Sequence, residues 1–551
     1  MTLHPLRPLG LAALLLAGSS ALAQEAPSPL DGTTIHGDFQ TDIQTYRPDE
    51  TIGAPRVPEK IRSNTFANLL MTNGRFSAGV RYEAYLAPLQ GFDSRYRGQG
   101  IAYRFATYSG NKLQVTVGNF YEQFGSGLIF RAYEERNLGI DNSLDGLRVR
   151  VTPRAGVRMT GMIGRQRYFF DKSPTIVRGV DGEVTLNDLL PGLDSAATRL
   201  TIGGSFVSKY EADTDPALIL PENVGAASGR LMLTNGGLAL NAEYAEKVND
   251  PSAANGFIYR PGRTALVSAT WSGNNIGLLL AAKRVDNFDF RVERNTTGNY
   301  GQLNFLPALT RQHTYALAGT IYPYATQPLG EMAAQAEVSY HAPKGGWGGR
   351  YGTDITLNAS AVNGIDRQPL NDLTTQRLGY SSSFFKPGGT VLFRDFNVEM
   401  HRRLTPAWKL NLMYLHLQYN KDLIEGVTGY GIIDADVAVV DVLYKFAPKH
   451  SVRVEAQTLQ TRKDMGSWAM GLLEYTYSPN WFATIFDQYN YGNPEAKKQI
   501  HYVGGQMGYV SGTTRIALGY GRQRAGIVCV GGVCRFVPAS NGASLSVTSS
   551  F

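Results

Sequence analysis

Side chains that could act on charged solutes recur at every second position of residues 393–404. The polar set is Asp395, Asn397, Glu399, His401 and Arg403, and the apolar set is Phe396, Val398, Met400 and Leu404. A period of two places the two sets on opposite faces of a β-strand. Mixed charges along one face can create a transverse electric field that filters solutes by size and charge. The same charges could instead pair across neighbouring strands and hydrate the wall.

Other alternating segments add charged candidates to the same polar face. The full set predicted to line an enclosed polar wall is Arg81, Glu83, Arg148, Arg150, Arg158, Glu337, Asp395, Glu399, His401, Arg403, Arg453 and Glu455. The pattern is imperfect in residues 408–420, where the apolar face shifts near Met413 and Tyr414. This shift predicts a β-bulge or a different register there.

Other kinds of chemistry find little support. The eight histidines show no spacing that suits a catalytic or metal-binding group, and Gly519-Tyr520-Gly521 lies in a strand pattern rather than before a helix. We therefore expect no enzyme activity, no metal and no cofactor. The net charge of +7 comes from scattered Lys and Arg residues, which argues against nucleic acid as a partner.

Cys529 and Cys534 are the two cysteines of the chain, in the sequence CVGGVC. The four residues between them suit a hairpin tip, and an exported protein meets an oxidising compartment. We expect a structural disulfide that clips a loop without affecting transport. Zinc binding would need a second pair of ligands at suitable spacing.

The N-terminus has the features of a secretory signal. Arg7 precedes the apolar run LGLAALLLA at residues 9–17, and Ala21-Leu22-Ala23 suits cleavage. The sequence therefore predicts a signal peptide at residues 1–23 and a single domain at residues 24–551.

That domain consists of short alternating strands joined by two kinds of connection. Some are short and rich in Gly, Asn or Pro, such as Thr72-Asn73-Gly74 and Ser478-Pro479-Asn480. Others are long and polar, and those that we identify are residues 47–63, 125–145, 211–224, 286–299, 363–381, 420–435 and 491–498. This arrangement is typical of an all-β, antiparallel transmembrane β-barrel with short periplasmic turns and longer extracellular loops. If residues 307–310 and about 191–197 are also short turns, the chain has about 26 strands, within an accepted range of 22–26.

The chain ends on the two-faced strand GASLSVTSSF. Leu545, Val547 and Phe551 lie on one face, which we expect to meet lipid, and a row of Ser and Thr lies on the other. A barrel must pair its last strand with its first, near residues 33–46, or leave unpaired edges in the membrane. The terminal aromatic residue resembles the signal that the bacterial barrel-assembly machinery recognises.

Three segments carry a resemblance to a known family: TTIHGDFQTDIQTY near the start, GNFYEQFGSGLIFRAYEER at residues 118–136, and the SSF ending. The mature chain resembles uncharacterised outer-membrane barrels of Bacteroidetes-type bacteria, a family with a domain of unknown function. The resemblance implies location in the bacterial outer membrane and supplies no activity.

Two functions fit these expectations. The first is a porin-like passive channel for small hydrophilic solutes. The second is a structural or secretion-machine barrel whose lumen is filled by its own loops or by a protein partner, in the lumen or the periplasm. A high strand count favours the second function, since wide barrels are usually plugged. The longest spare loops, residues 125–145 and 363–381, are the candidates for a plug.

Overall fold

The computed structural model describes residues 32–370 and 377–551. The predicted signal peptide at residues 1–23 lies outside this part of the chain and remains a prediction. In the described part, no helix is both long and apolar enough to cross a membrane.

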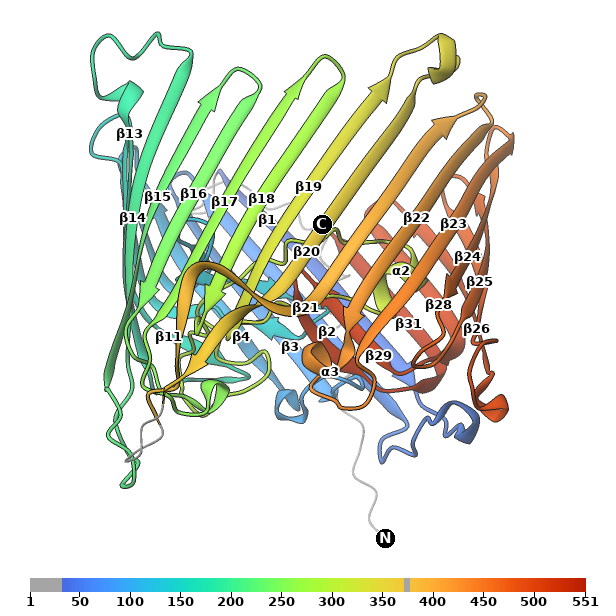
Figure 1. Cartoon of the computed structure of the whole chain (residues 1–551), viewed down its shortest axis with the longest axis horizontal. Helices are drawn as coiled ribbons and strands as arrows, with labels where there is room; N and C mark the ends of the chain where they lie inside the picture. The colour runs from blue at the N-terminus through green and yellow to red at the C-terminus, as the bar shows by residue number, and fades with distance from the viewer. Residues whose placement is uncertain (1–31, 371–376) are drawn as a thin grey trace, which may run out of the picture.

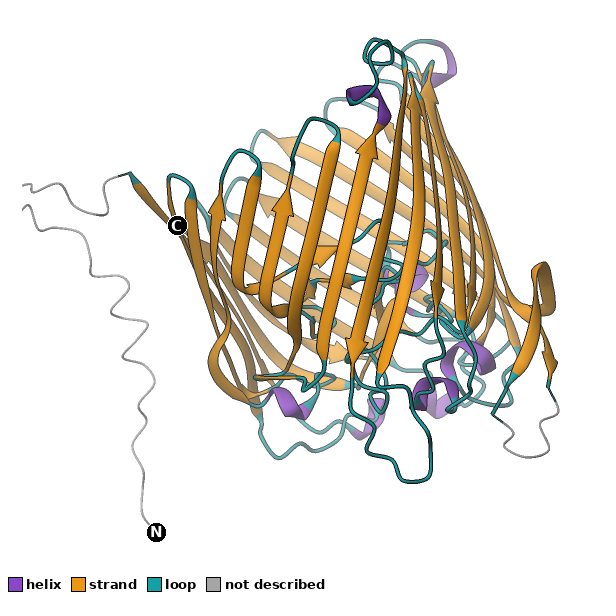
Figure 2. Cartoon of the chain, turned by 90° about the vertical axis from the view of Figure 1, so that its left-hand side faces the viewer, coloured by secondary structure: helices purple, strands orange, loops and turns teal. Residues whose placement is uncertain are grey.

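Most of the described strands form one closed antiparallel barrel (Figures 1 and 2). The first twelve wall strands are β1 (Thr33–Thr45), β2 (Ile61–Asn73), β3 (Phe76–Ala87), β4 (Gly98–Ser109), β5 (Leu113–Phe120), β10 (Leu144–Val151), β11 (Val157–Tyr168), β13 (Ile176–Thr185), β14 (Thr198–Tyr210), β15 (Asn223–Asn235), β16 (Leu238–Lys247) and β17 (Gly262–Gly273). The other twelve are β18 (Ile276–Asp286), β19 (Gly330–Ala342), β20 (Thr353–Pro369), β21 (Tyr380–Arg403), β22 (Trp408–Asn420), β23 (Ile432–Ala447), β24 (His450–Gln460), β25 (Trp468–Tyr477), β26 (Trp481–Tyr489), β27 (His501–Ser511), β28 (Thr514–Gln523) and β31 (Ser540–Ser550).

The sheet includes 25 strands, of which β12 (Asp171–Lys172) pairs only with β11, so that 24 strands form the wall. This number lies within the predicted range. One expected turn is wrong: residues 307–310 belong to a long connection at residues 287–329 and do not separate two wall strands. That difference removes the thirteenth hairpin.

The last strand closes the barrel. β31 pairs with β28 on one side and with β1 on the other, where Leu545 lies opposite Ile43 and Ser550 opposite Asp38. The backbone N–H of Phe551 donates to the carbonyl of Gly37 at 2.9 Å, and the N–H of Gly37 donates back at 3.0 Å. The terminal strand is therefore paired to its last residue.

The two ends of the barrel differ as the sequence predicts. Tight turns such as residues 74–75, 236–237 and 512–513 lie at the upper end in Figure 1, and most longer connections lie at the lower end or inside. Residues 186–197, expected in part as a short turn, and residues 343–352 are longer connections at the upper end. Several long connections were not predicted, and they are residues 88–97, 169–175, 248–261, 461–467 and 524–539. Short helical turns occupy several connections: η1 (Glu50–Ile52), η2 (Ser94–Tyr96), η3 (Leu186–Asp188), η4 (Ala253–Asn255), η5 (Gly346–Gly348), α3 (Lys421–Glu425) and η6 (Ala496–Lys498).

The outer wall is apolar. Exposed residues at alternate positions include Ile101, Val117, Val180, Met507 and Leu518. A closed barrel that leaves no backbone edge unpaired and exposes an apolar outer face is suited to a lipid bilayer. The protein is a barrel of the bacterial outer membrane.

The hairpin of β20 and β21 was expected as a plug candidate, and this expectation is wrong. Its long end bends outward, away from the lumen (Figure 2), and Phe384 packs on Tyr244 and Arg284 of neighbouring wall strands. The Tyr380 hydroxyl donates to Asp286 at 2.7 Å. These contacts attach the hairpin to the outer side of the rim. Residues 371–376 of this loop lie outside the described chain.

Candidate functional site: a lumen filled by the chain's own loops

Three connections from the long-loop end enter the lumen and interlock. We call residues 121–143, 287–329 and 524–539 together the plug. The first contains β6 (Glu122–Gln123), β7 (Arg131–Ala132), β8 (Glu134–Glu135) and β9 (Ile140–Asp141), the second contains α2 (Ala316–Thr320), and the third contains β29 (Gly526–Val530) and β30 (Val533–Val537). Figure 1 shows α2 inside the barrel.

Backbone hydrogen bonds join the three segments. The N–H of Arg131 donates to Leu303 at 2.7 Å, and the N–H of Phe305 donates to Gly127 at 2.9 Å. The N–H of Thr326 donates to Gly532 at 3.1 Å, which connects the second segment to the third. The plug is one folded unit made from distant parts of the chain.

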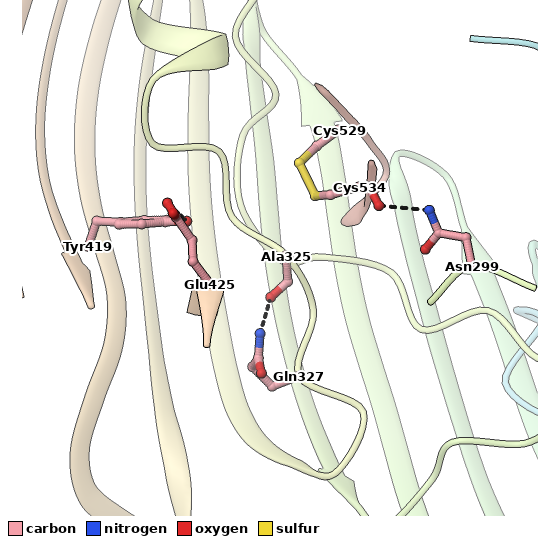
Figure 3. The surroundings of a disulfide bond; sticks show 7 residues. All are labelled: Asn299, Ala325, Gln327, Tyr419, Glu425, Cys529 and Cys534. Carbon is pink, nitrogen blue, oxygen red and sulfur yellow. Dashed lines mark hydrogen bonds between the residues drawn. A yellow bond between two sulfur atoms is a disulfide. The ribbon is translucent and has the colours of Figure 1, made fainter. Parts of the chain in front are cut away.

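The predicted disulfide is present in the third segment. Cys529 and Cys534 face each other across β29 and β30, and Figure 3 shows the bond beside the second plug segment. The Asn299 amide donates to the Cys534 carbonyl at 2.7 Å. The disulfide therefore lies in the plug, inside the lumen, whereas the sequence suggested only a loop tip.

The plug packs on an apolar part of the inner wall. Leu317 and Tyr322 of the second segment belong to the same buried cluster as the inward residues of β22 and β23, which are Met413, Leu415, Leu417, Tyr419, Ile433, Ala435, Val437 and Val439. Both described pairings of β22 keep one register throughout. The expected bulge near Met413 is therefore wrong. The inner face of this strand is apolar because the plug covers it.

The first plug segment has its own apolar anchor. Phe124, Leu128, Ile129 and Phe130 are almost fully buried, together with inward residues such as Val177, Val207 and Val224 of the wall. Burial of such side chains contributes roughly 1.5–3 kcal/mol each. These residues belong to the stretch 118–136 that the sequence analysis singled out.

A buried ion cluster joins this segment to the wall. Arg81 and Glu83 of β3 pair at 2.7 Å, and Arg167 of β11 pairs with Glu83 at 2.6 Å. Both arginines also bind Asp141 of the plug, at 2.6 Å for Arg167. Burial raises the pKa of Asp141, but Arg167 and Arg81 outweigh it and hold this pKa below its ordinary value.

Two lysines and an aspartate form a second buried cluster. Lys209 and Lys247 point inward from β14 and β16 and pair with Asp250 at 3.0 and 3.1 Å. Both ammonium groups lie about 6 Å from the ring of Phe290 in the plug, at 6.0 and 5.7 Å from its centroid. Lys283 of β18 pairs with Glu331 at 2.6 Å and donates to the Pro307 carbonyl of the plug.

A third contact involves two of the predicted wall carboxylates. Arg311 of the plug pairs with Glu337 at 2.7 Å and with Glu399 at 2.8 Å. The ring of His313 lies 3.7 Å from Glu399. The plug therefore neutralises charge that sequence reasoning assigned to an open wall.

The remaining predicted residues lie in separate groups. Arg148 donates to the Tyr121 carbonyl at 2.9 Å, Arg150 pairs with Glu122 of the plug at 2.6 Å, and Arg158 pairs with Glu183 at 2.7 Å. Arg453 bonds Asp441 at 2.9 Å and also pairs with Glu455. Asp395 accepts from Asn397 at 2.8 Å. His401 bonds Asn411, and Arg403 lies over the Tyr351 ring near the tight turns.

One side of the lumen carries small residues. A cavity of about 430 Å³ separates α2 and β29 from the wall formed by β26, β27, β28, β31 and β1. Its lining includes Gly504, Gly519, Gly521, Gly542, Gln506 and Ser544. Glycine and serine leave room here that larger inward side chains would fill. We call this space the side passage.

One cation of the plug lines the side passage. Arg524 donates to the carbonyl and hydroxyl of Thr320, each at 2.6 Å, and lies 5.8 Å from the Trp468 ring. No carboxylate of the described residues forms an ion pair with it. Burial lowers the pKa of Arg524 to about 10, so the group stays protonated at neutral pH.

A second cavity lies on the other side of the plug. It measures about 490 Å³, and its charged lining residues are Glu122, Arg150, Arg158, Asp181, Glu183, Arg230 and Glu243. The Ser126 N–H donates to Glu243 at 2.7 Å, so the plug borders this space. Among residues 32–370 and 377–551, no group of three or more His, Cys, Asp or Glu could hold a metal ion.

Sequence reasoning missed plug residues of these contacts, including Arg311 and Asp141, and the wall residue Lys283. One signal could have found them. Four inward apolar residues in succession on β22, Met413 to Tyr419 at alternate positions, need a partner inside the lumen.

Residues 8–551 match the model of a family of unknown function, DUF6029, and the chain belongs to that family. No curated protein has a significantly similar sequence.

Several solved barrels have a similar arrangement at low identity. The translocation pore of the P pilus usher (PapC) is 9% identical, covers 94% of this chain and 99% of its own, and has a TM-score of 0.42. The siderophore receptor PirA from Pseudomonas aeruginosa is 9% identical, covers 94% and 80%, and has a TM-score of 0.41. OccK11 (OpdR) from Pseudomonas aeruginosa is 8% identical, covers 95% and 96%, and has a TM-score of 0.30.

Proposed function

We propose that the protein is a self-constricted outer-membrane channel that passes small hydrophilic solutes through the side passage. The observation that carries this proposal is the unequal filling of the lumen. The plug packs on apolar and charged wall residues of β3 to β25 and leaves there a cavity lined by ion-paired charges, whereas the wall from β26 to β1 offers Gly, Ser and Gln beside a cavity. Polar, small side chains along a cavity are suited to hydrated solutes.

The predicted wall charges take a different role in this proposal. Glu337, Glu399 and Arg81 bind plug residues, and Glu83 pairs with Arg81, so these groups position the plug rather than meet solutes. Arg403 and the Arg453–Glu455 pair lie nearer the tight turns, where they border the entrance from the periplasm.

Blocking the side passage tests the proposal. Ser544→Trp together with Gln506→Trp places two large side chains in the cavity. Leu545→Trp together with Met507→Trp is the matched control, because these neighbours lie on the outer face of the same strands. We expect the first pair to abolish uptake of a small sugar into liposomes and the second to leave uptake unchanged. Equal uptake in both pairs would contradict the proposed path.

A second candidate function is a barrel whose plug is displaced by a protein partner. The observation that favours it is the charge at the contact between plug and wall, since Asp141 and Arg311 each bridge two wall groups. Charges that separate regain their hydration, so a contact made of ion pairs opens into water more readily than an apolar contact does. Wild-type protein without measurable conductance would support this candidate. Under either function, we propose that Phe551 is read by the barrel-assembly machinery and that the outer face contacts lipid.

A further inference from the structure

The outer wall carries a concentrated basic patch near the long-loop end. Four cations, Arg104, Arg165, Lys172 and Arg178, lie on or beside β4, β11 and β13, within the run of adjacent strands β4, β5, β10, β11 and β13. All are exposed or half-exposed, and the side chains of Arg104 and Lys172 are 55% and 42% accessible. We call these four residues the outer basic patch.

Strand register brings these residues together. Asp145 of β10 lies opposite Arg165 of β11 and opposite Asn119 of β5. Lys172 reaches Asp145 at 2.5 Å and Arg104 approaches it at 3.6 Å. Arg178 belongs to the next strand, opposite Ile163, two residues from Arg165. Lys172 and Arg104 therefore approach Asp145 on the outside of the barrel, with Arg165 opposite it and Arg178 one strand further.

The acids in this region are too few to neutralise the patch. The region contains two carboxylates, Asp145 and the exposed Asp171, and four cations, which leaves two positive charges in excess. Arg178 has Asn223, an uncharged amide, as its polar partner at 3.3 Å. Two or three guanidinium groups in reach of one anion can bind a phosphate with several charge-assisted hydrogen bonds.

The patch lies at the edge of the apolar belt. On β11 the outward residues Met159 and Ile163 precede Arg165, and on β10 the outward residues Leu147 and Val149 follow Asp145. Phe170 and Ile101 add exposed apolar surface beside the cations. A lipid with a phosphorylated headgroup presents the same order, with acyl chains next to phosphates.

The opposite part of this rim has a different charge. Outward residues there include Asp434, Asp436 and Asp487, of which Asp436 pairs with His416 at 3.0 Å and Asp487 with His501 at 2.6 Å. Other outward cations near this end, such as Arg263 and Arg522, pair with Glu246 and Asp49, so the unbalanced positive charge described above lies on one side of the barrel. Uniform attraction to the membrane surface would not require such asymmetry.

From these observations we propose that the outer basic patch binds the phosphorylated headgroup of a glycolipid in the outer leaflet. The long-loop end of the barrel faces the cell exterior, so the patch meets that leaflet. Basic side chains at the edge of a membrane-spanning surface are a recognised means of binding anionic lipid headgroups. This inference is independent of the solute path.

The test uses full-length protein refolded in zwitterionic detergent and titrated with bis-phosphorylated lipid A, with binding followed by native mass spectrometry. We expect Arg104→Gln, Arg165→Gln and Arg178→Gln together to weaken binding about tenfold or more. The control triple Lys112→Gln, Arg154→Gln and Lys449→Gln changes exposed cations in the tight turns at the other end and is expected to bind like wild type.

Three results would overturn the proposal. These are equal binding by the patch triple and wild type, equal binding of dephosphorylated lipid A, and full competition by millimolar inorganic phosphate, which would indicate a site for free phosphate. Heat-modifiable gel mobility verifies that each variant forms a barrel. If the patch triple does not fold, Lys172→Gln lies outside the barrel wall and is expected to weaken binding by itself; unchanged binding in that variant would refute the site.

Discussion

At the scale of single residues, Arg524 is the group most directly placed to select solutes. It lines the side passage, and its hydrogen bonds go to the uncharged Thr320. A buried cation without a counter-ion attracts anions to its surroundings, because screening by water is reduced there.

We therefore predict that the channel prefers anions and that Arg524→Gln removes most of this preference. Arg522→Gln is the control, since Arg522 pairs with Asp49 at 2.8 Å and its charge is already balanced. Reversal potentials in a salt gradient measure the preference, and low salt enlarges the effect. A preference that survives Arg524→Gln would place the selecting charge elsewhere.

Asp141 gives the plug a defined response to acid. Its pKa in the attached plug is lower than the ordinary value of 3.8, so its ion pairs contribute fully above that value and are lost as the pH falls below it. We expect conductance to stay constant from pH 7 to about 5 and to rise below about 3.8. Asp141→Asn should raise conductance at pH 7, whereas Asp213→Asn, in a loop outside the lumen, should not. A rise already between pH 7 and 5 would contradict this assignment.

The aromatic residue at the end of the chain, Phe551, packs on Gly37 of the first strand. A β-carbon at Gly37 would lie 2.3 Å from Cζ of Phe551, so the ring covers the glycine across the closing seam. We predict that Gly37→Ala reduces the folded fraction in a heat-modifiability assay. Gly161→Ala is the control, because its β-carbon meets open space on the outer wall. Equal folding of the two variants would show that this contact does not matter for closure.

At the scale of elements, the hairpin of β29 and β30 holds the third plug segment together. It contacts the second segment through Gly532 and Cys534. We now predict that Cys529→Ser with Cys534→Ser increases conductance or its fluctuations, because the unclipped hairpin orders the plug less tightly. Planar-bilayer recording with and without a reductant measures this effect. If reductant does not change the conductance of wild-type protein, the disulfide has the simpler role first expected, a clip without effect on transport.

The wall elements and one plug segment, the candidate loop at residues 125–145, were predictable from the sequence, and the other two plug segments were not. Each wall strand has a local period of two, and tight turns such as residues 72–74 carry their own Gly and Asn. Residues 287–329 have no period, because their apolar side chains pack on wall strands about a hundred residues away, as Leu317 shares a buried cluster with Leu415 and Val437. Non-local packing of that kind leaves no pattern in the segment itself. The irregular alternation of β22 is visible in the sequence, but its cause, packing of this strand against the plug, is not.

At the scale of the whole molecule, 24 strands enclose a lumen that would breach the outer membrane if it were empty. Two apolar clusters and several buried ion groups attach the plug to most of the wall. The remaining space includes the side passage and the second, charged cavity. The account therefore combines the two functions considered from the sequence: a channel, and a barrel filled by its own loops.

The most direct test of this account compares single-channel conductance of wild-type protein with that of a variant in which residues 304–328 are replaced by a short Gly/Ser linker. Both ends of this segment leave from inside the lumen near β18 and β19, so the wall is unchanged. We predict a small, steady conductance for wild type and one about tenfold or more larger for the variant, because a barrel of this strand number encloses a wide aqueous lumen. Equal conductance in two folded barrels would contradict the claim that the chain's own loops set the width of the pore.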